Sequence, residues 1–260
     1  MSALGVDVSH YQGSIDWEKV AADGKKFAIM KAQYEASSHR IDEYFEANYK
    51  GAGKYGLARG VYIFVGSASV ADPIADALAL VKKLNGRTLE YGIWIDLEAS
   101  AVRKLSKAEI THLVHVYANI FETNGYFTGI YCNKDWYNNV LDSKKLAEDY
   151  EFWIARYPSN DTGVYNATSS LSPKSYACAW QYSSKGSVSG ISGNVDLDVD
   201  FDGVLTLTGD TGKKSTAAIA KEVIANKWGT ASTSPTRQEL LEAAGYDYQT
   251  VRKKVNELLS

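Results

Sequence analysis

Short apolar segments alternate with amphipathic stretches from residue 3 to residue 201, and this alternation limits the folds open to the chain. The stretch after Ser106 is the clearest helix, because Ser106 and Glu109 form a capping box and apolar residues follow at helical spacing. Strands that alternate with helices form a parallel sheet, and about eight strands in roughly 210 residues indicate a β/α barrel. Because few helices separate the last strands, we expect an irregular barrel. The predicted strands are 3–8, 26–32, 59–65, 91–97, 127–132, 151–155, 176–182 and 195–201, and the predicted helices are 16–24, 41–56, 70–85, 106–124 and 134–148.

The end of the chain differs in charge and in pattern. Residues 213–260 hold eight Lys and Arg against five Asp and Glu, a net charge of +3, whereas the whole chain carries −3. The small, polar segment Thr206–Ser215 is typical of a linker. We therefore expect a barrel domain over 1–208, a linker over 209–214 and an all-α module of three short helices over 215–260.

Four residues set the predicted ends of the helices in this module. Ser234 and Pro235 fit an N-cap and a proline at the first helical position, which would begin the second helix. Gly245 fits the C-cap of the second helix, and Asp247 fits the N-cap of the third.

Acidic residues mark three of the predicted strands. In the segment GIWIDLE, Asp96 and Glu98 face away from the apolar positions, because side chains alternate along a strand. Asp7 in the first strand, and Asp196 with Asp198 in the last, follow the same pattern. The carboxyl ends of the strands of a parallel barrel meet at one mouth, where active sites lie. We therefore expect four of these carboxyl groups in a single pocket, namely those of Asp7, Asp96, Glu98 and Asp196.

Clustered carboxyl groups are suited to acid–base chemistry on a glycosidic bond. Neighbouring carboxylates raise one another's pKa, so one carboxyl can protonate the leaving oxygen while the others stabilise positive charge at the anomeric carbon. Two other interpretations stay open at this point. A single aspartate at a strand end is commonly a helix cap, and four carboxylates are also suitable ligands for Mg²⁺ or Ca²⁺.

Other features argue against several classes of protein. A net charge of −3 is untypical of nucleic-acid-binding proteins, and no apolar run is long enough for membrane insertion. As written, the sequence starts without a signal peptide, so we expect synthesis in the cytoplasm.

His112 and His115 lie one helical turn apart without a third ligand, and we predict no metal and no cofactor. Cys132 and Cys178 are expected to be buried free thiols rather than a disulfide.

Eight segments, in order along residues 3–202, carry a specific resemblance to a known family. They are Gly5–Gln12, Phe27–Ala32, Arg59–Phe64, Ile93–Glu98, Gly129–Tyr131, Phe152–Tyr157, Trp180–Ser184 and Val195–Asp198. As a set they closely resemble glycoside hydrolase family 25, the muramidases often called Chalaropsis-type lysozymes. The resemblance implies a flattened β/α barrel that cleaves the β-1,4 bond between N-acetylmuramic acid and N-acetylglucosamine in bacterial peptidoglycan.

The resemblance also implies roles for individual residues. Glu98 matches the general acid, and Asp96 matches the carboxylate that tunes it or stabilises the transition state. Asp7 and Asp196 match the remaining acidic positions of the pocket. The residues expected to line the sugar-binding groove are Tyr62, Tyr131, Trp153, Arg156, Gln181 and Asp198. Packing in the core is an equal alternative for Tyr131, Trp153, Arg156 and Gln181.

The tail resembles the short three-helix cell-wall-binding repeat of certain phage endolysins, most extensively over Leu241–Gln249. The loop Thr230–Thr236 departs from the glycine-containing turn that is usual in this repeat. The resemblance implies wall binding through Arg237, Tyr246 and Asp247, with helix capping as the alternative role of Asp247. A single copy lacks the avidity of repeated copies, and a spacer or oligomerisation element is the alternative for the module.

These features together predict an endolysin-like, bacteriolytic enzyme whose partners are peptidoglycan glycan strands and muropeptides. Such an enzyme would reach the cell wall through a holin pore, or by secretion if a signal has been removed. Two rival classes remain at this level. A non-catalytic peptidoglycan lectin would tolerate Glu98→Gln, and a metal-dependent hydrolase would lose activity to a chelator.

Overall fold

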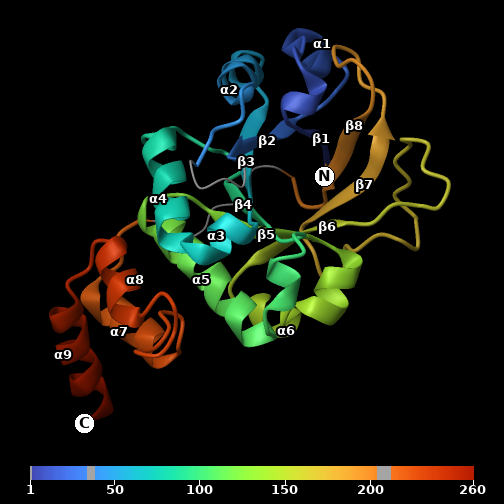
Figure 1. The fold of residues 1–260 in the computed structure, drawn as a ribbon. Helices are drawn as coiled ribbons and strands as arrows, with labels where there is room; N and C mark the ends of the chain where they lie inside the picture. The colour runs from blue at the N-terminus through green and yellow to red at the C-terminus, as the bar shows by residue number, and fades with distance from the viewer. Residues whose placement is uncertain (1, 34–38, 204–211) are drawn as a thin grey trace.

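The computed structural model describes residues 2–33, 39–203 and 212–260, and its first part is a closed barrel of eight strands in sequence order (Figure 1). Neighbouring strands from β1 to β7 run parallel, as the alternation of strands and helices predicts. The predicted α/β barrel is therefore confirmed. The strands are β1 (Ala3–Val8), β2 (Phe27–Gln33), β3 (Ala58–Phe64), β4 (Ile93–Asp96), β5 (Thr128–Asn133), β6 (Glu151–Ala155), β7 (Ala179–Gly186) and β8 (Val195–Asp200).

Helices cover the outside of the barrel (Figure 1). The capping box of Ser106 and Glu109 begins α5, as predicted. The predicted helix over 70–85 is divided, because Asp72 caps a new helix whose first residue is Pro73. The predicted helix over 134–148 is wrong in its extent, since a π-helical turn (Trp136–Val140) and a short α6 take its place. The helices are α1 (Trp17–Ala22), α2 (Phe45–Lys54), α3 (Ser67–Ala71), α4 (Pro73–Leu84), α5 (Lys107–Thr123) and α6 (Ser143–Leu146).

The last strand corrects one expectation about direction. β8 runs antiparallel to both β7 and β1, so its acidic residues do not lie at a C-terminal strand end at the mouth. No helix separates β7 from β8, and a short connection between adjacent strands returns the chain in the opposite direction. Asp196 nevertheless reaches the mouth, because it is near the N-terminal end of β8 and pairs with Asp7 of β1.

The wall of the barrel separates two apolar regions. Ile93 and Ile95 of β4 belong to the larger region, which also contains the buried faces of the helices. Phe27, Trp94 and Trp153 belong to a smaller region inside the barrel. The alternation of side chains along the strands is therefore as predicted, and it directs Asp96 inward with Trp94.

Three helices form the tail: α7 (Thr216–Ile224), α8 (Arg237–Ala243) and α9 (Tyr248–Leu259). The predicted cap at Ser234 is wrong, because Thr236 caps α8 and forms a capping box with Glu239. The peptide bond between Ser234 and Pro235 is cis and precedes the helix. Asp247 caps α9 as predicted, and Gly245 follows the C-cap of α8 with a left-handed backbone (φ 80°). Residues 209–211 of the predicted linker lie outside the described residues.

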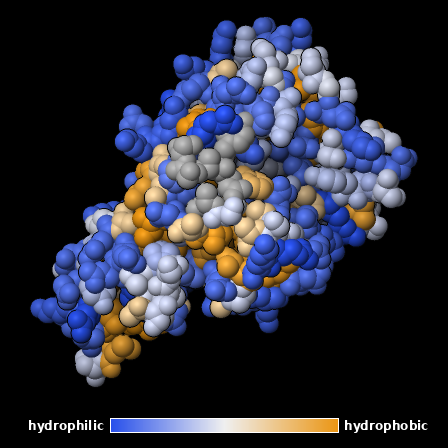
Figure 2. Space-filling view, viewed as in Figure 1, coloured by the Kyte–Doolittle hydropathy of each residue, from blue (hydrophilic) through white to orange (hydrophobic). Residues whose placement is uncertain are grey.

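The tail contacts the barrel along α5 (Figure 1). The Nδ2 atom of Asn119 donates to the carbonyl oxygen of Lys227 over 2.9 Å, and His112 Nε2 lies 3.0 Å from the carbonyl oxygen of Pro235. Lys227 also forms an ion pair with Asp149. Most of the face drawn in Figure 2 is hydrophilic, with apolar side chains near its centre and in the tail. Among the described residues, none of the helices has both the length and the apolar character needed to cross a bilayer.

Trp228 is the largest buried side chain of the tail, with 1% of its surface exposed. Its ring packs edge-on against Tyr246 with 5.6 Å between centroids, and its Nε1 atom donates to Glu222 Oε2 over 2.9 Å. We expect Trp228→Ala to lower the free energy of unfolding of the tail by about 3–5 kcal/mol. Urea denaturation followed through the NMR signals of the tail measures this loss. Leu258→Ala, at an exposed position of α9, is the control, and equal losses in both variants would contradict the prediction.

Candidate active site

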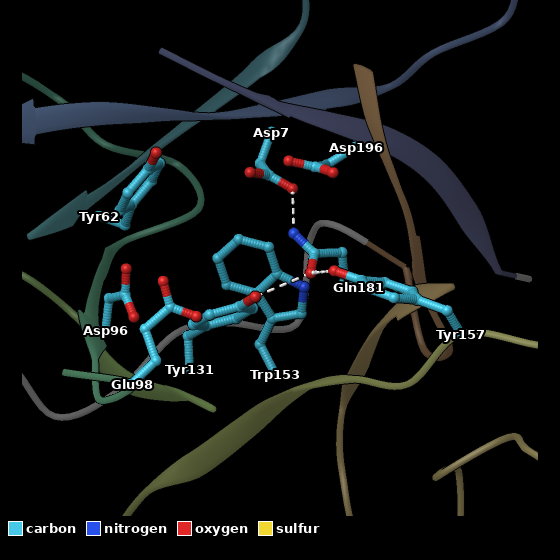
Figure 3. Close-up of a pocket in the computed structure, with 9 residues that line it drawn as sticks. All are labelled: Asp7, Tyr62, Asp96, Glu98, Tyr131, Trp153, Tyr157, Gln181 and Asp196. Carbon is cyan, nitrogen blue, oxygen red and sulfur yellow. Dashed lines mark hydrogen bonds between the residues drawn. The ribbon is translucent and has the colours of Figure 1, made fainter. Parts of the chain in front are cut away.

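A cavity of about 220 Å³ opens at the mouth of the barrel. Strands of the barrel, and loops that follow them directly, supply all of its side chains. Acidic groups occupy two opposite sides of the cavity, and aromatic rings with one amide lie between them (Figure 3). The lining residues are Asp7, Tyr62, Asp96, Glu98, Tyr131, Trp153, Tyr157, Gln181 and Asp196.

The barrel brings the four predicted catalytic acids together. Asp96 is the last residue of β4, and Glu98 follows it by two positions on the same side of the cavity (Figure 3). Asp7 and Asp196 lie on the opposite side, because they pair with each other where β8 closes the barrel against β1. The sequence pattern therefore located the acids correctly, although it gave the wrong direction for the last strand.

The two most deeply buried of these acids have strongly raised pKa values. Burial is the main cause for Asp7, because desolvation penalises its charged form, and the negative charges of Asp196 and Asp198 raise its pKa further. Burial also raises the pKa of Asp96, followed by the charge of Glu98. The ammonium group of Lys31 opposes this effect on Asp96 by attracting its carboxylate form.

The other two acids are less buried. Partial burial, followed by the charges of Glu98 and Asp161, raises the pKa of Asp196 from 3.8 to about 6. Glu98 stands at the exposed rim of the cavity, where surrounding protein atoms still desolvate its carboxyl enough to raise its pKa. Lys31 opposes this rise too. All four acids therefore hold protons at higher pH than free side chains would.

Gln181 fixes the geometry between the two acidic sides. Its Nε2 atom donates to Asp7 Oδ2 over 2.6 Å, and its Oε1 atom accepts from the hydroxyl of Tyr131 over 2.8 Å and from the hydroxyl of Tyr157. Because the amide oxygen accepts hydrogen bonds from two hydroxyl groups, the amide nitrogen must point to Asp7. The amide thus holds the Asp7 carboxyl in one orientation.

A buried layer supports the cavity from below. Trp153 packs against Tyr131 with ring centroids 4.4 Å apart, and its Nε1 atom donates to Asp198 Oδ1 over 2.9 Å. Asp198 is fully buried, and burial followed by the charge of Asp196 raises its pKa well above the usual value. Asp198 therefore lies beneath the cavity and does not line it.

Arg156 also lies outside the lining residues. Its Nη1 atom donates to the carbonyl oxygens of Ser170 and Leu171, which braces the segment between β6 and β7.

Sequence reasoning missed Tyr157, which lines the cavity directly after the end of β6. It also missed Lys31, whose Nζ atom lies 5.7 Å from the ring centroid of Tyr62. Lys31 shares the inward face of β2 with Phe27 and Ile29, and the two-residue spacing in the sequence predicts this face.

The three predicted wall-binding residues lie in the tail, and each has an internal partner. Arg237 Nε donates to the carbonyl oxygen of Gly229 over 2.9 Å. The buried hydroxyl of Tyr246 accepts from the backbone nitrogen of Lys214 over 2.9 Å. Asp247 Oδ1 accepts from the backbone nitrogen of Thr250 over 2.8 Å. Their contribution to wall binding stays a prediction.

The histidines and cysteines considered in the sequence lie outside the cavity. His112 contacts the tail through Pro235, and burial lowers the pKa of His115 to about 4. Cys132 and Cys178 are buried free thiols, as predicted. Within the ranges that the structure describes, no group of three or more His, Cys, Asp and Glu side chains is arranged to hold a metal ion.

Two family models match this chain, each over a different range of residues. The model of glycosyl hydrolases family 25 matches residues 6–191, and the model of the CW_7 repeat matches residues 217–259. The first match covers the strands and loops that supply most of the cavity, and the second covers the three helices of the tail.

Several known proteins are similar to most of this chain. Lysozyme M1 of Streptomyces globisporus is 32% identical over 206 residues, which cover 74% of this chain and 65% of that protein. The autolytic lysozyme of Clostridium acetobutylicum is 28% identical over 77% of this chain and 56% of its own length. The chain thus spans less than two thirds of either relative. The crystal structure of the bacterial lysozyme from Streptomyces coelicolor is 29% identical with a TM-score of 0.59, covering 79% of this chain and 96% of that one.

The raised pKa of Asp196 gives stability a defined pH dependence. The folded protein holds this proton more tightly than the unfolded chain, so the stabilisation is complete below pH 3.8 and is lost as the pH rises through about 6. We expect Asp196→Asn to be more stable than the wild type at pH 7, by up to about 3 kcal/mol, and close to it near pH 4. Urea unfolding at several pH values measures the difference. Glu148→Gln, at an exposed surface carboxylate, is the control, and a pH-independent difference for Asp196→Asn would contradict the prediction.

Proposed function

The chain belongs to glycosyl hydrolases family 25, and from this membership we propose that it hydrolyses peptidoglycan. The proposed reaction cleaves the β-1,4 bond between N-acetylmuramic acid and N-acetylglucosamine in the bacterial cell wall. One observation carries the proposal: Glu98 and Asp96 face Asp7 and Asp196 across one cavity at the mouth of the barrel.

Glu98 is the proposed general acid. Its raised pKa keeps a larger fraction protonated than for a free glutamate, and its place at the rim gives the leaving oxygen access to that proton. Once the proton is transferred, the new carboxylate lies beside Asp96. The burial that raises the pKa of Asp96 favours its neutral form, which limits repulsion between the two groups, and the positive charge of Lys31 favours the ionised Glu98.

The opposite side of the cavity is suited to stabilise the sugar cation. As the glycosidic bond breaks, positive charge develops at the anomeric carbon and the ring oxygen. Asp196, with a pKa of about 6, ionises readily when such a charge approaches. Gln181 meanwhile holds the Asp7 carboxyl in place through its amide nitrogen. Preorganised groups of this kind lower the barrier without reorganising during the reaction.

Aromatic side chains give the cavity its proposed preference for sugars. Tyr62, Tyr131 and Trp153 line it, and each combines a flat apolar face with a polar atom. Pyranose rings have the same two characters, since their axial C–H groups are apolar and their hydroxyl groups are polar. The hydroxyl of Tyr131 is already bonded to Gln181, so its ring presents a fixed surface to the substrate.

We expect Glu98→Gln to lower kcat by about 10²- to 10⁴-fold without unfolding the protein, because the amide cannot donate the acid proton. Purified peptidoglycan would be digested with chelator present, reduced with borohydride and analysed by mass spectrometry. The wild type should produce new muramitol ends. Glu148→Gln, at an exposed glutamate before β6, is the matched control and should retain full activity.

Three results would contradict parts of this proposal. New glucosaminitol ends would keep the glycosidase and overturn the assigned bond. Activity lost with chelator and restored by Mg²⁺ would favour the metal-dependent hydrolase. Wall binding by the wild type without any new reducing ends would leave a non-catalytic peptidoglycan lectin.

The tail is proposed to bind the cell wall. The match of residues 217–259 to the CW_7 repeat supports this role, as does the net positive charge of residues 213–260, since an anionic wall attracts a basic module. Domain boundaries at 1–208 and 215–260 are proposed on the same grounds. The module would keep the barrel near its insoluble substrate between successive cleavages.

Asp247 allows capping and wall binding to be separated. Both hydrogen bonds from Thr250 reach Oδ1, and the side chain is exposed. A serine at this position retains the cap but removes the second oxygen. We expect Asp247→Ser to leave the melting temperature close to that of the wild type and to reduce retention on purified cell wall in a sedimentation assay. Full retention would mean that Asp247 serves only as a helix cap.

A further inference from the structure

An exposed tyrosine stands next to the active-site strand β1. Tyr11 has 82% of its surface exposed, more than any other large apolar or aromatic side chain among the described residues. A single exposed ring is ordinary on a protein surface, and exposure alone assigns no role. Two further observations, its rigid support and its position, distinguish Tyr11 from an ordinary surface residue.

A network of hydrogen bonds holds the 3₁₀ turn His10–Gln12 that carries the tyrosine. Ser9 Oγ accepts from the backbone nitrogen of Tyr11, and Gln12 Oε1 accepts from the backbone nitrogen of Ser9 over 2.9 Å. Ser9 and Gln12 also form a capping box. The buried carboxylate of Asp42 accepts from the backbone nitrogen of His10 over 3.1 Å and lies 3.0 Å from Nδ1 of the same residue. The turn is therefore fixed from both ends.

The ring itself is also held. The imidazole of His10 packs against it with 4.1 Å between the ring centroids, at an angle of 36°. Binding to a surface side chain normally costs the rotamer freedom that the side chain loses. Because one neighbour already restricts the Tyr11 ring, a ligand that stacks on it loses less free energy in this way. The arrangement is that of a preformed platform.

The platform lies outside the cavity, on the side of Asp7 and Asp196. Tyr11 follows Asp7 by four residues, directly beyond the carboxyl end of β1. Gln12 Nε2 donates to the carbonyl oxygen of Asn194, the residue before β8, over 3.4 Å. The turn thus spans the ends of the two strands that carry Asp7 and Asp196. A chain that leaves the cavity on the side of Asp7 and Asp196 passes over the ends of these two strands, where the turn lies.

The size of the cavity requires such a continuation for a polymeric substrate. At about 220 Å³ it is smaller than the roughly 300–1,000 Å³ of pockets that enclose drug-sized ligands. A glycan strand therefore has most of its sugars outside it. We propose that Tyr11 forms an outer glycan-binding subsite, on which an amino-sugar ring of the strand stacks beyond the Asp7 and Asp196 side of the cavity. This inference rests on the proposed peptidoglycan substrate.

The test compares substrates of two lengths. Peptide-free glycan fragments from peptidoglycan would be separated into a tetrasaccharide and much longer strands. We expect Tyr11→Ala to raise KM about tenfold on long strands, with kcat unchanged, and to leave tetrasaccharide kinetics at wild-type values. Tyr11→Phe keeps the ring and should behave as the wild type. Tyr55→Ala is the matched control, because Tyr55 follows α2 at the opposite end of the barrel.

Each outcome decides the inference. Equal KM values for wild type and Tyr11→Ala on long strands would overturn the subsite while the hydrolase stands. An equal rise in KM on the tetrasaccharide would also overturn it, since the effect would then not depend on sugars beyond the fourth. If the wild type cleaves neither substrate, the proposed function fails. The affinity for long strands, measured by calorimetry, then tests the subsite without any cleavage. Equal affinities of the wild type and Tyr11→Ala would overturn it.

Discussion

The pairing of β1 with β8 is the contact on which the site depends. It closes the barrel, and because the pair is antiparallel it sets Asp7 opposite Asp196 in register. A parallel β8 would carry Asp196 to the far end of the barrel and bring a later residue to the mouth. The place of Asp196 beside Asp7, on the side of the cavity that faces Glu98, is therefore a product of one strand direction. Gln181 of β7, which also pairs with β8, then fixes one of them by a hydrogen bond.

Burial of several acids near one another is unfavourable for folding, and the surrounding residues offset only part of that cost. Hydrogen bonds from Gln181 to Asp7 and from Trp153 to Asp198 lower the pKa values that burial raises, and Lys31 acts similarly on Asp96. The net shifts remain upward. Carboxyl groups whose pKa is raised by folding lower the free energy of unfolding at neutral pH, because they ionise more readily in the unfolded chain. The same shifts let the carboxyl groups keep their protons at higher pH than free side chains do, which is the property that an acid catalyst needs.

Much of this arrangement could be predicted from the sequence, and the errors have physical causes. The alternation of side chains located Asp96 and Glu98 correctly, because a period of two residues survives in any strand environment. The same period is identical for parallel and antiparallel strands, so it carried no information on the direction of β8. Lys31 obeys the alternation, but a lone lysine on an apolar strand gives no indication of the acids that it meets across the barrel. Arg156 was expected in the groove, whereas the carbonyl oxygens of the next loop hold its guanidinium.

The position of the tail leaves the mouth of the barrel accessible. Its contacts run along α5, through residues such as Asn119 and His112, and none of the described residues 212–260 lines the cavity. The ion pair between Lys227 and Asp149 is partly exposed, and pairs of this kind contribute little binding free energy. A module attached in this way adds affinity for an insoluble substrate mainly by raising the effective concentration of the barrel at its surface. The barrel must then hold its own strand of glycan during cleavage, and contacts at the rim of a small cavity are where that additional binding has to arise.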